Sequence, residues 1–285
     1  MKRILVTGAT GFIGNSLVEK LLDNGYDVIP VGMTLKPWAS DFIRENLYKI
    51  DLVTEKLPDL GKIDCACLLA SRQPYKKNEW SKYYEINSKQ IFHFLNIDMN
   101  QLIYISTTTV NLINGVPNPK NYYGLSKALG ERLLEINKGH FKQSSILRFP
   151  SVMGVNHHGG IINDLKAWID KDEKIDLYDG GRKYRNILHV NEAVSAIIRV
   201  IESSKKLSQY EEFEIGSKNS NTLSEIANIL IRLMDKDIKV NLLEKSTNTN
   251  DVYVNNSKAV SKLGYLPKTI EDGIKQYLKD CNYEV

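Results

Sequence analysis

The stretch that decides the fold is T-G-A-T-G-F-I-G, residues 7–14, near the start of the 285-residue chain. It follows a short apolar run, residues 3–7, and opens a segment, residues 11–24, whose apolar residues recur at helical spacing. Glycines in a strand-to-helix turn let the backbone approach a phosphate, and the helix N-terminus offers N–H groups and a positive dipole. The motif therefore predicts a dinucleotide site. Its predicted residues are Gly8, Thr10, Gly11, Phe12, Ile13 and Gly14.

Strand-like runs alternate with helix-period segments through the first half of the chain, which indicates a parallel sheet with helices on both faces. The expected strands are residues 3–7, 27–31, 48–50, 63–69, 101–105 and 144–148. Further helices are expected at residues 82–97 and 122–137. Six strands are the number that a doubly wound nucleotide-binding sheet needs. The predicted fold class is thus α/β, with a doubly wound parallel (Rossmann) sheet.

After Pro150 the pattern becomes irregular. Helices are expected at residues 161–170, 191–201, 223–234, 257–263 and 270–279, with a strand pair near 175–188 and an apolar run at 213–215. We interpret this part as a smaller, interleaved C-terminal substrate lobe. The predicted domains are a dinucleotide-binding Rossmann domain, residues 1–150, and a mainly substrate-binding lobe, residues 151–285, with some segments returning to the Rossmann core.

Composition is that of an ordinary globular protein, with 42% apolar residues, 25% charged residues and a formal net charge of +4. Basic residues are scattered, so no nucleic-acid partner is expected. No apolar run has the length of a signal peptide or a membrane span, which predicts a cytoplasmic protein without a membrane partner. The spacing of Cys65, Cys67 and Cys281 predicts neither a disulfide nor a metal site. His157 and His158 are interpreted as solvated loop residues.

A second motif, Y-G-L-S-K at residues 123–127, lies in the helix expected after the fifth strand. Tyr123 and Lys127 are four residues apart, so they share one face of that helix. An ammonium beside a phenol favours the phenolate and brings the tyrosine toward acid–base work near neutral pH. We therefore predict a catalytic pair. The hydroxyls of residues 107–109, at the carboxyl end of the fifth strand, face the same crevice.

These motifs resemble those of the extended short-chain dehydrogenase/reductases, the NAD(P)-dependent epimerase, dehydratase and reductase group that acts on nucleotide-activated sugars. The resemblance covers nearly the whole chain. Its further elements are Asp51-Leu52, L-L-A-S at 68–71, Asn87, S-T-T-T-V at 106–110, L-R-F-P-S-V-M-G at 147–154 and G-G-R-K-Y-R-N-I-L-H-V at 180–190.

The resemblance implies a role for each matching position. Tyr123 is the acid–base, Lys127 holds the ribose and tunes that tyrosine, and Thr107 polarises the sugar oxygen. Asn87 is either structural or part of a proton relay. The other implied cofactor contacts are Asp51, Leu52, Leu69, Ala70, Ser71, Phe149 and Val152. The implied substrate contacts are Thr108, Ser151, Arg185 on the diphosphate, and Lys245 in place of a second arginine.

Two departures from the family pattern narrow the expected reaction. The 4,6-dehydratases of the group carry Asp and Glu directly after the catalytic Thr, where this chain has Thr108 and Thr109. Dehydration is therefore not expected, because its acid and base are missing. At the end of the second strand, Gly32 replaces the acidic residue that would hold the adenosine ribose. Without that carboxylate the site tolerates a 2′-phosphate on the ribose, with Lys36 as the partner of the phosphate. The sequence thus slightly favours NADP(H) over NAD(H).

The leading hypothesis is hydride transfer at C4 of a nucleotide-diphosphate sugar by a 4-keto-6-deoxyhexose reductase in surface-polysaccharide precursor synthesis. A nucleotide-sugar 4-epimerase with tightly held NAD would use the same residues. A hypothesis of another class is a non-catalytic NAD(P)-binding regulatory protein, against which the complete Thr, Tyr and Lys set argues. The resemblance also implies a homodimer formed through the helices that hold Asn87 and Tyr123.

Overall fold

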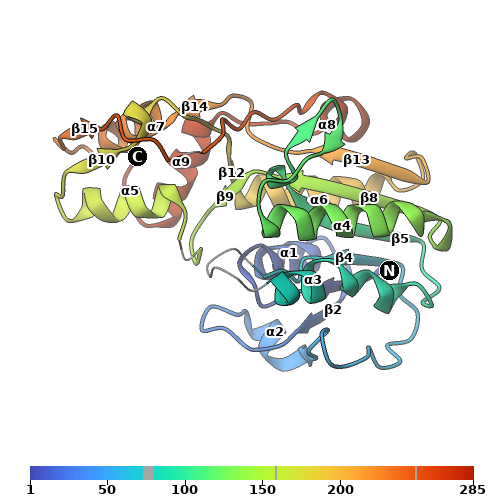
Figure 1. Cartoon of the computed structure of the whole chain (residues 1–285). Helices are drawn as coiled ribbons and strands as arrows, with labels where there is room; N and C mark the ends of the chain where they lie inside the picture. The colour runs from blue at the N-terminus through green and yellow to red at the C-terminus, as the bar shows by residue number, and fades with distance from the viewer. Residues whose placement is uncertain (73–79, 158, 248) are drawn as a thin grey trace.

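A central parallel sheet dominates the computed structural model, which describes residues 1–72, 80–157, 159–247 and 249–285. Its seven strands lie in the order β3-β2-β1-β4-β5-β8-β13 (Figure 1). They are β1 (Arg3–Thr7), β2 (Asp27–Gly32), β3 (Tyr48–Lys49), β4 (Cys65–Leu68), β5 (Gln101–Thr107), β8 (Gln143–Phe149) and β13 (Tyr210–Glu214). The strand order runs outward from β1 in both directions, so the winding reverses between β1 and β4, where such sheets bind ligands. The predicted fold class is confirmed.

Alternate residues of each strand pack into separate cores on the two faces of the sheet. Ile103 and Ile105 of β5 belong to one core, and Leu102 and Tyr104 belong to the other. The first face is covered by α1 (Phe12–Asp23), α2 (Asp41–Asn46), α6 (Val190–Ser203) and α8 (Ser257–Leu263). The second is covered by α3 (Trp80–Asn87), the 3₁₀ helix η1 (Lys89–Phe94) and α4 (Tyr122–Ile136). Residues 82–97, predicted as one helix, therefore form two.

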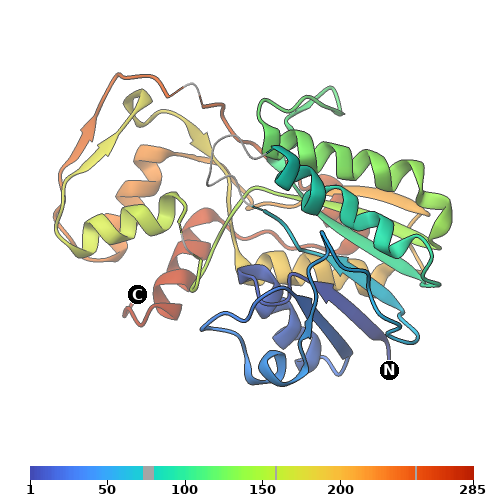
Figure 2. The same ribbon diagram turned by 60° about the horizontal axis from the view of Figure 1, so that its bottom comes forward.

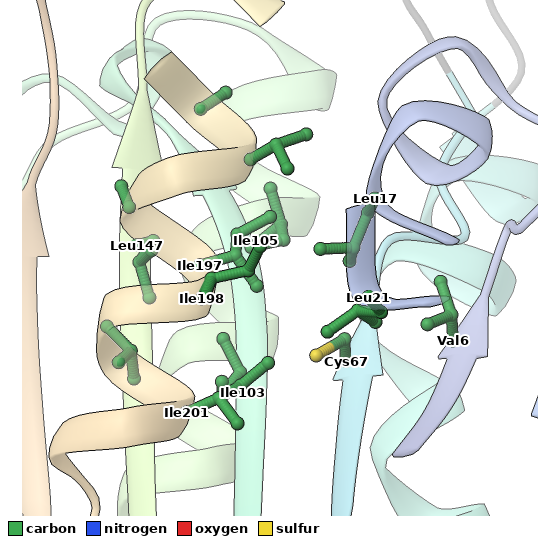
Figure 3. Packing of buried hydrophobic residues seen from close by; sticks show 14 of the residues in the cluster. Val6, Leu17, Leu21, Cys67, Ile103, Ile105, Leu147, Ile197, Ile198 and Ile201 are labelled. Carbon is green, nitrogen blue, oxygen red and sulfur yellow. The ribbon is translucent and has the colours of Figure 1, made fainter. Parts of the chain in front are cut away.

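Strand β13 belongs to the part of the chain after Pro150, from which some segments were expected to return to the Rossmann core, and it adds a seventh strand to the six expected. Strand β13 pairs in parallel with β8, and α6 packs on the same sheet (Figure 3). In that figure Ile197 and Ile201 of α6 point toward β5. The glutamates of Y-E-E-F-E hid the strand pattern, because Glu211 is buried yet paired with lysines.

The predicted strand pair near residues 175–188 is wrong. Three short strands occupy this region, and each pairs with a distant segment instead of with a neighbour. These pairs are β10 (Ile175–Leu177) with β15 (Val240–Leu242), β11 (Tyr184–Arg185) with β14 (Asn221–Thr222), and β12 (Ile187–His189) with β9 (Ser151–Met153). Gly180 and Gly181, both at positive φ, turn the chain between the first two strands. Such short strands carry too little periodicity to reveal their partners.

A third core fills the small lobe, which lies beside the sheet in both views of the chain (Figures 1 and 2). Its helices are α5 (Ile161–Asp170), α7 (Leu223–Leu233) and α9 (Ile270–Asp280). The remaining elements are the hairpin β6 (Leu112–Ile113) and β7 (Val116–Pro117) and the 3₁₀ turns η2 (Thr108–Val110), η3 (Lys138–His140) and η4 (Asp179–Gly181). Within the described ranges, no helix combines the length and apolarity that crossing a membrane requires.

Candidate active site

A cleft of about 900 Å³ opens at the carboxyl ends of β1, β4, β5 and β8 and continues to the small lobe. The predicted residues that line it are Gly8, Gly11, Phe12, Ile13, Gly14, Leu69, Ser71, Thr107, Thr108, Tyr123, Lys127, Phe149, Ser151, Val152 and Arg185. The predicted residues that the structure describes outside this lining are Thr10, Asp51, Leu52, Ala70, Asn87 and Lys245. The structure therefore brings both motifs to one cleft.

The glycine turn leaves no room for side chains. A Cβ on Gly14 would lie 2.1 Å from the carbonyl oxygen of Gly8, which itself has φ +66°. The first hydrogen bond of α1 runs from the Asn15 N–H to the Gly11 carbonyl at 2.9 Å, so the preceding N–H groups emerge from the helix end. The first turn carries no acidic residue. This cradle fits the pyrophosphate of a dinucleotide.

Ala70 and Thr10, two predicted residues outside the cleft lining, limit the space around Gly8 and Gly32. A Cβ on Gly8 would lie 2.7 Å from the amide nitrogen of Ala70, whose N–H donates to Thr7 Oγ1 at 3.1 Å. A Cβ on Gly32 would lie 3.2 Å from Thr10 Oγ1. A larger side chain at the end of β2 would therefore require a small shift of the Thr10 side chain.

The predicted adenine contacts lie away from the cleft. Asp51 Oδ1 accepts the Val53 N–H at 2.9 Å and so closes a turn. The Leu52 side chain is buried in the core of the second face. Lys36 and Trp38 line the cleft on this side instead. The sequence suggested Lys36, whereas no pattern in the loop after β2 pointed to Trp38.

Helix α4 holds the predicted catalytic pair. It begins after Asn121, whose side-chain oxygen accepts the Gly124 N–H at 2.8 Å, and this cap places Tyr123 in the first turn. Lys127 is 2% exposed, and its Nζ donates to the Ile105 carbonyl at 2.9 Å. Burial lowers the pKa of Lys127 to about 7, although Glu131 acts in the opposite direction. This lysine is therefore poised between its charged and neutral forms near neutral pH.

Three consecutive threonines lie where β5 ends and η2 begins. Thr107 Oγ1 accepts the Thr109 N–H at 3.1 Å and donates to Thr109 Oγ1 at 3.0 Å. Thr107, Thr108 and Thr109 all line the cleft, so hydroxyls stand where the dehydratase pattern has carboxyls.

The charged residues of the cleft wall have one sign. Among the described residues that line it, Lys36, Arg72, Lys127 and Arg185 are basic and none is an aspartate or glutamate. A wall with cations and no carboxylates attracts anionic ligands. Phosphorylated ligands therefore suit this cleft.

Asn87 is fully buried and ties two parts of the site together. Its Oδ1 accepts from the Arg72 N–H at 2.8 Å and from Ser71 Oγ at 3.0 Å. Its Nδ2 donates to Ser126 Oγ at 3.0 Å. The loop after β4 is thus joined to α4, the helix that carries Tyr123 and Lys127. Of the two roles left open for Asn87, these contacts favour the structural one.

Arg185 lies at the end of the cleft that reaches the small lobe. Its guanidinium donates to the Asn250 carbonyl and to Thr249 Oγ1, both at 2.9 Å, so it holds that segment beside the cleft. Ser151, the first residue of β9, is exposed and lines the cleft. Lys245 lies elsewhere, with its ammonium 5.7 Å from the centre of the Tyr178 ring.

Several residues of the cleft wall were missed because only tertiary packing brings them there. His157 stacks on Phe12 with ring centres 4.9 Å apart, although its sequence context indicated a solvated loop. His158 lies outside the described residues. Asn163 lines the same wall and accepts the Tyr277 hydroxyl at 2.6 Å. An asparagine before a helix predicts a cap, and that signal alone could have found Asn121.

Comparison with known proteins identifies the family. The chain matches the model of the NAD dependent epimerase/dehydratase family over residues 4–216. The chain belongs to this family. It is 26% identical to an uncharacterised protein of Methanocaldococcus jannaschii, MJ1055, over 99% of this chain and 96% of that protein. It is 22% identical to the dTDP-4-dehydro-6-deoxy-D-allose reductase of Streptomyces bikiniensis, over 85% of this chain and 84% of that enzyme.

A solved structure supports the same fold. The UDP-glucuronic acid 4-epimerase of Bacillus cereus, in complex with UDP-glucuronic acid and NAD, has a TM-score of 0.83 and 23% identity, over 98% of this chain and 99% of that one. Family membership confirms the resemblance to extended short-chain dehydrogenase/reductases and confirms that this epimerase/dehydratase-family chain is an enzyme. The hypothesis of a non-catalytic regulatory protein is set aside. No group of metal-ligating side chains is found in the part of the chain that the structure describes.

Proposed function

We propose that this family member reduces the 4-keto group of a nucleotide-diphosphate 4-keto-6-deoxyhexose, using NADPH, in surface-polysaccharide precursor synthesis. The observation that carries the proposal is the hydroxyl set at the end of β5. Thr108 and Thr109 stand where a dehydratase would carry the carboxylates that catalyse elimination, and the described cleft wall contains no carboxylate. Thr107 and Tyr123 are present, and their hydroxyls suit chemistry at a carbonyl group. The reductase from Streptomyces bikiniensis among its relatives is consistent with this choice.

The residues of the cleft divide the work of such a reduction. A bound nicotinamide supplies the hydride. The Tyr123 phenol gives its proton to the sugar oxygen, and the Lys127 ammonium stabilises the phenolate that remains. The Thr107 hydroxyl donates to the same oxygen and stabilises its developing charge. The Arg185 guanidinium suits the diphosphate, because its planar fork matches two phosphate oxygens.

The end of β2 favours NADP(H) over NAD(H). Gly32 offers no carboxylate to the ribose, and a Cβ there would approach Thr10 Oγ1 to 3.2 Å. Lys36 lines the neighbouring part of the cleft and provides a cation for a 2′-phosphate. A reductase must exchange its cofactor in each turnover, whereas an epimerase returns the hydride to the same sugar. A site for NADP(H) is therefore an argument for the reductase.

A helix surface next to the site supports the expected homodimer. Phe92, Tyr122 and Leu125 are exposed to 45%, 53% and 38% along η1 and α4. Pairing of two copies through this surface would cover these apolar side chains. Light scattering of the wild-type enzyme and of Leu125→Glu tests the proposal, and a wild-type monomer contradicts it.

The reaction is tested first by ligand binding. UDP-, dTDP-, GDP- and CDP-sugars are screened by thermal shift with and without NADPH, because ligands of the native state raise its melting temperature. The 4-keto-6-deoxy derivatives of the bases that bind are then supplied, and NADPH consumption is followed with identification of the sugar product. Consumption of NADPH with formation of a 4-hydroxyl supports the reductase. An enzyme that is purified with NAD and interconverts C4 isomers without added cofactor is a 4-epimerase, and the proposal is then wrong.

A further inference from the structure

A buried row of charges lies under the catalytic helix. Glu131 and Arg148 have side chains that are each 4% exposed. Arg148 Nε donates to Glu131 Oε1 at 2.9 Å, and its Nη2 donates to Glu131 Oε2 at 2.6 Å. The same Nη2 lies 2.7 Å from Glu212 Oε2. Ser106 Oγ donates to Glu131 Oε1 at 2.5 Å. The Glu131 carboxylate is therefore held by donors from two strands.

The position of this carboxylate relates it to the catalytic lysine. Glu131 follows Lys127 by one turn of α4, so both side chains face the sheet. Ser106 of β5 and Arg148 of β8 are direct partners in the sheet register, and both reach Glu131. Through Glu131, Ser106 and Arg148 thus fasten α4 to two neighbouring strands at the level of the active site.

Electrostatics link Glu131 to Lys127. An ammonium that is removed from water loses its solvation, and burial accordingly lowers the pKa of Lys127. The negative charge of Glu131 acts in the opposite direction and favours the ammonium. Arg148 fixes that charge in a two-bond fork, while Glu212 lies on the far side of Arg148. The charges of Lys127, Glu131, Arg148 and Glu212 alternate in sign and sum to zero.

We propose that Glu131 is a positioning residue of the active site, which acts through Lys127. Its carboxylate, held by Arg148 and Ser106, balances the buried Lys127 ammonium and keeps it available to Tyr123. The inference rests on the role of Lys127 in the proposed function. The competing explanation is that Glu131 only braces α4 against the sheet.

The other titratable groups around Lys127 define the test. From β5, the Tyr104 ring lies below the ammonium, with its centre 5.0 Å from Nζ. From α4, Tyr123 shares the face of Lys127 with Glu131. From β8, Arg148 stands behind Glu131. Removal of the Glu131 charge changes the balance at Lys127. It also removes one of the charges that, after burial, raise the pKa of Tyr104, so the Lys127 signal itself has to be followed.

The decisive variant is Glu131→Gln, which keeps the shape of the side chain and removes its charge. The full-length protein is labelled with ¹⁵N-lysine, and the Lys127 signal is assigned by its loss in Lys127→Met. We expect the titration midpoint of Lys127 to fall by about one pH unit in Glu131→Gln, because an opposite charge has been removed from a buried site. The alkaline limit of turnover is expected to fall with it.

Glu212→Gln is the matched control. It also removes a carboxylate from Arg148, but on the side away from Lys127. We expect it to lower the melting temperature while leaving the Lys127 midpoint in place. Glu131→Asp keeps the charge and breaks the two-bond fork, so it is expected to lose stability with a smaller change of the midpoint than Glu131→Gln.

An unchanged midpoint in Glu131→Gln overturns the inference and leaves Glu131 as a brace. If that variant does not fold, the double variant Glu131→Gln/Arg148→Gln provides the test, because two amides can bond to each other in place of the ion pair. Loss of the negative charge one turn from Lys127 should still lower the Lys127 midpoint, and a midpoint that does not fall overturns the inference. Full activity of Lys127→Met would contradict the proposed function instead, while the titrations would still decide whether Glu131 balances Lys127.

Discussion

The hydroxyl of Tyr104 occupies the space that a side chain at Gly130 would need. A Cβ on Gly130 would lie 2.2 Å from that oxygen and 2.9 Å from the carbonyl oxygen of Asn87, to which Tyr104 donates at 2.5 Å. The glycine therefore lets α4 approach the sheet closely. Since the Tyr104 ring also lies below Lys127, the distance between α4 and β5 sets the height of this lysine in the cleft.

Gly130→Ala is expected to destabilise the enzyme by about 1–3 kcal/mol, because it overpacks a filled interface. It should also lower turnover, since α4 carries Tyr123 and Lys127. Chemical denaturation and steady-state rates provide the measurement. A Cβ on Gly130 would also lie 2.6 Å from the ring carbon that bears the Tyr104 hydroxyl. Tyr104→Leu removes both the ring and its oxygen, so the double variant should be more stable than the sum of the two single effects predicts. Simple additivity would show that the two residues do not compete for this space.

Tyr123→Phe is expected to lower turnover by about 10²–10⁴-fold, because the sugar oxygen loses its proton donor. The affinity for the cofactor should change little, since the glycine turn remains intact. Turnover and cofactor titration by fluorescence are measured on the same preparation. Tyr122→Phe is the control, because Tyr122 is the neighbouring tyrosine of α4 and is absent from the described cleft wall. A fully active Tyr123→Phe enzyme contradicts the assignment.

Lys36→Ala is expected to raise the KM for NADPH about tenfold and to leave the KM for NADH nearly unchanged. The substitution removes the cation that would pair with the 2′-phosphate of NADPH, which NADH lacks. A tenfold change in KM corresponds to about 1.4 kcal/mol. Lys62→Ala is the control, because the Lys62 side chain is 82% exposed and away from the cleft. Equal effects on both cofactors would remove the argument for NADP(H).

Glu211 makes the stability of the enzyme depend on pH. Burial raises the pKa of Glu211, but hydrogen bonds from Lys258 and Lys262 of α8 outweigh it and lower the pKa to about 2 from the ordinary 4.5. The stabilisation is therefore complete above pH 4.5 and is lost as the pH falls toward 2. Glu211→Gln should cost about 1 kcal/mol at neutral pH, since both lysines are half exposed.

Denaturation of the wild type and of Glu211→Gln across this acid range checks the linkage. The difference in the free energy of unfolding should shrink as the pH falls below 4.5. A difference that stays constant down to the lowest pH at which both proteins fold would mean that Glu211 contributes no ionised pair.

The sequence predicted the elements whose periodicity is local. The turn at Gly8 and the helix that carries Tyr123 were found because their residue spacing reflects a single element. Strand β13 was missed because the partners that compensate its buried Glu211, namely Lys258 and Lys262, come from a helix far along the chain. The two- and three-residue strands of the small lobe were mispaired for a similar reason.

The same distinction between local and tertiary contacts explains which residues of the candidate site the sequence could predict. Tyr123, Lys127, Thr107 and Gly8 lie in the cleft because motif positions are fixed by their own strand or helix. The wall that contains Trp38 and His157 comes from loops whose paths depend on contacts with other elements, so spacing gave no indication of it. Asp51 and Leu52 match a sequence pattern, yet their side chains serve a turn and the core.

The late position of β13 in the chain has a consequence for biosynthesis. Until residues 210–214 leave the ribosome, the edge of β8 has no neighbour on that side, and Arg148 lacks one of its two carboxylates. An unpaired, apolar strand edge is a template for aggregation. A nascent chain that stalls before β13 is therefore expected to depend on chaperones, even though its glycine turn and Tyr123 have already been translated.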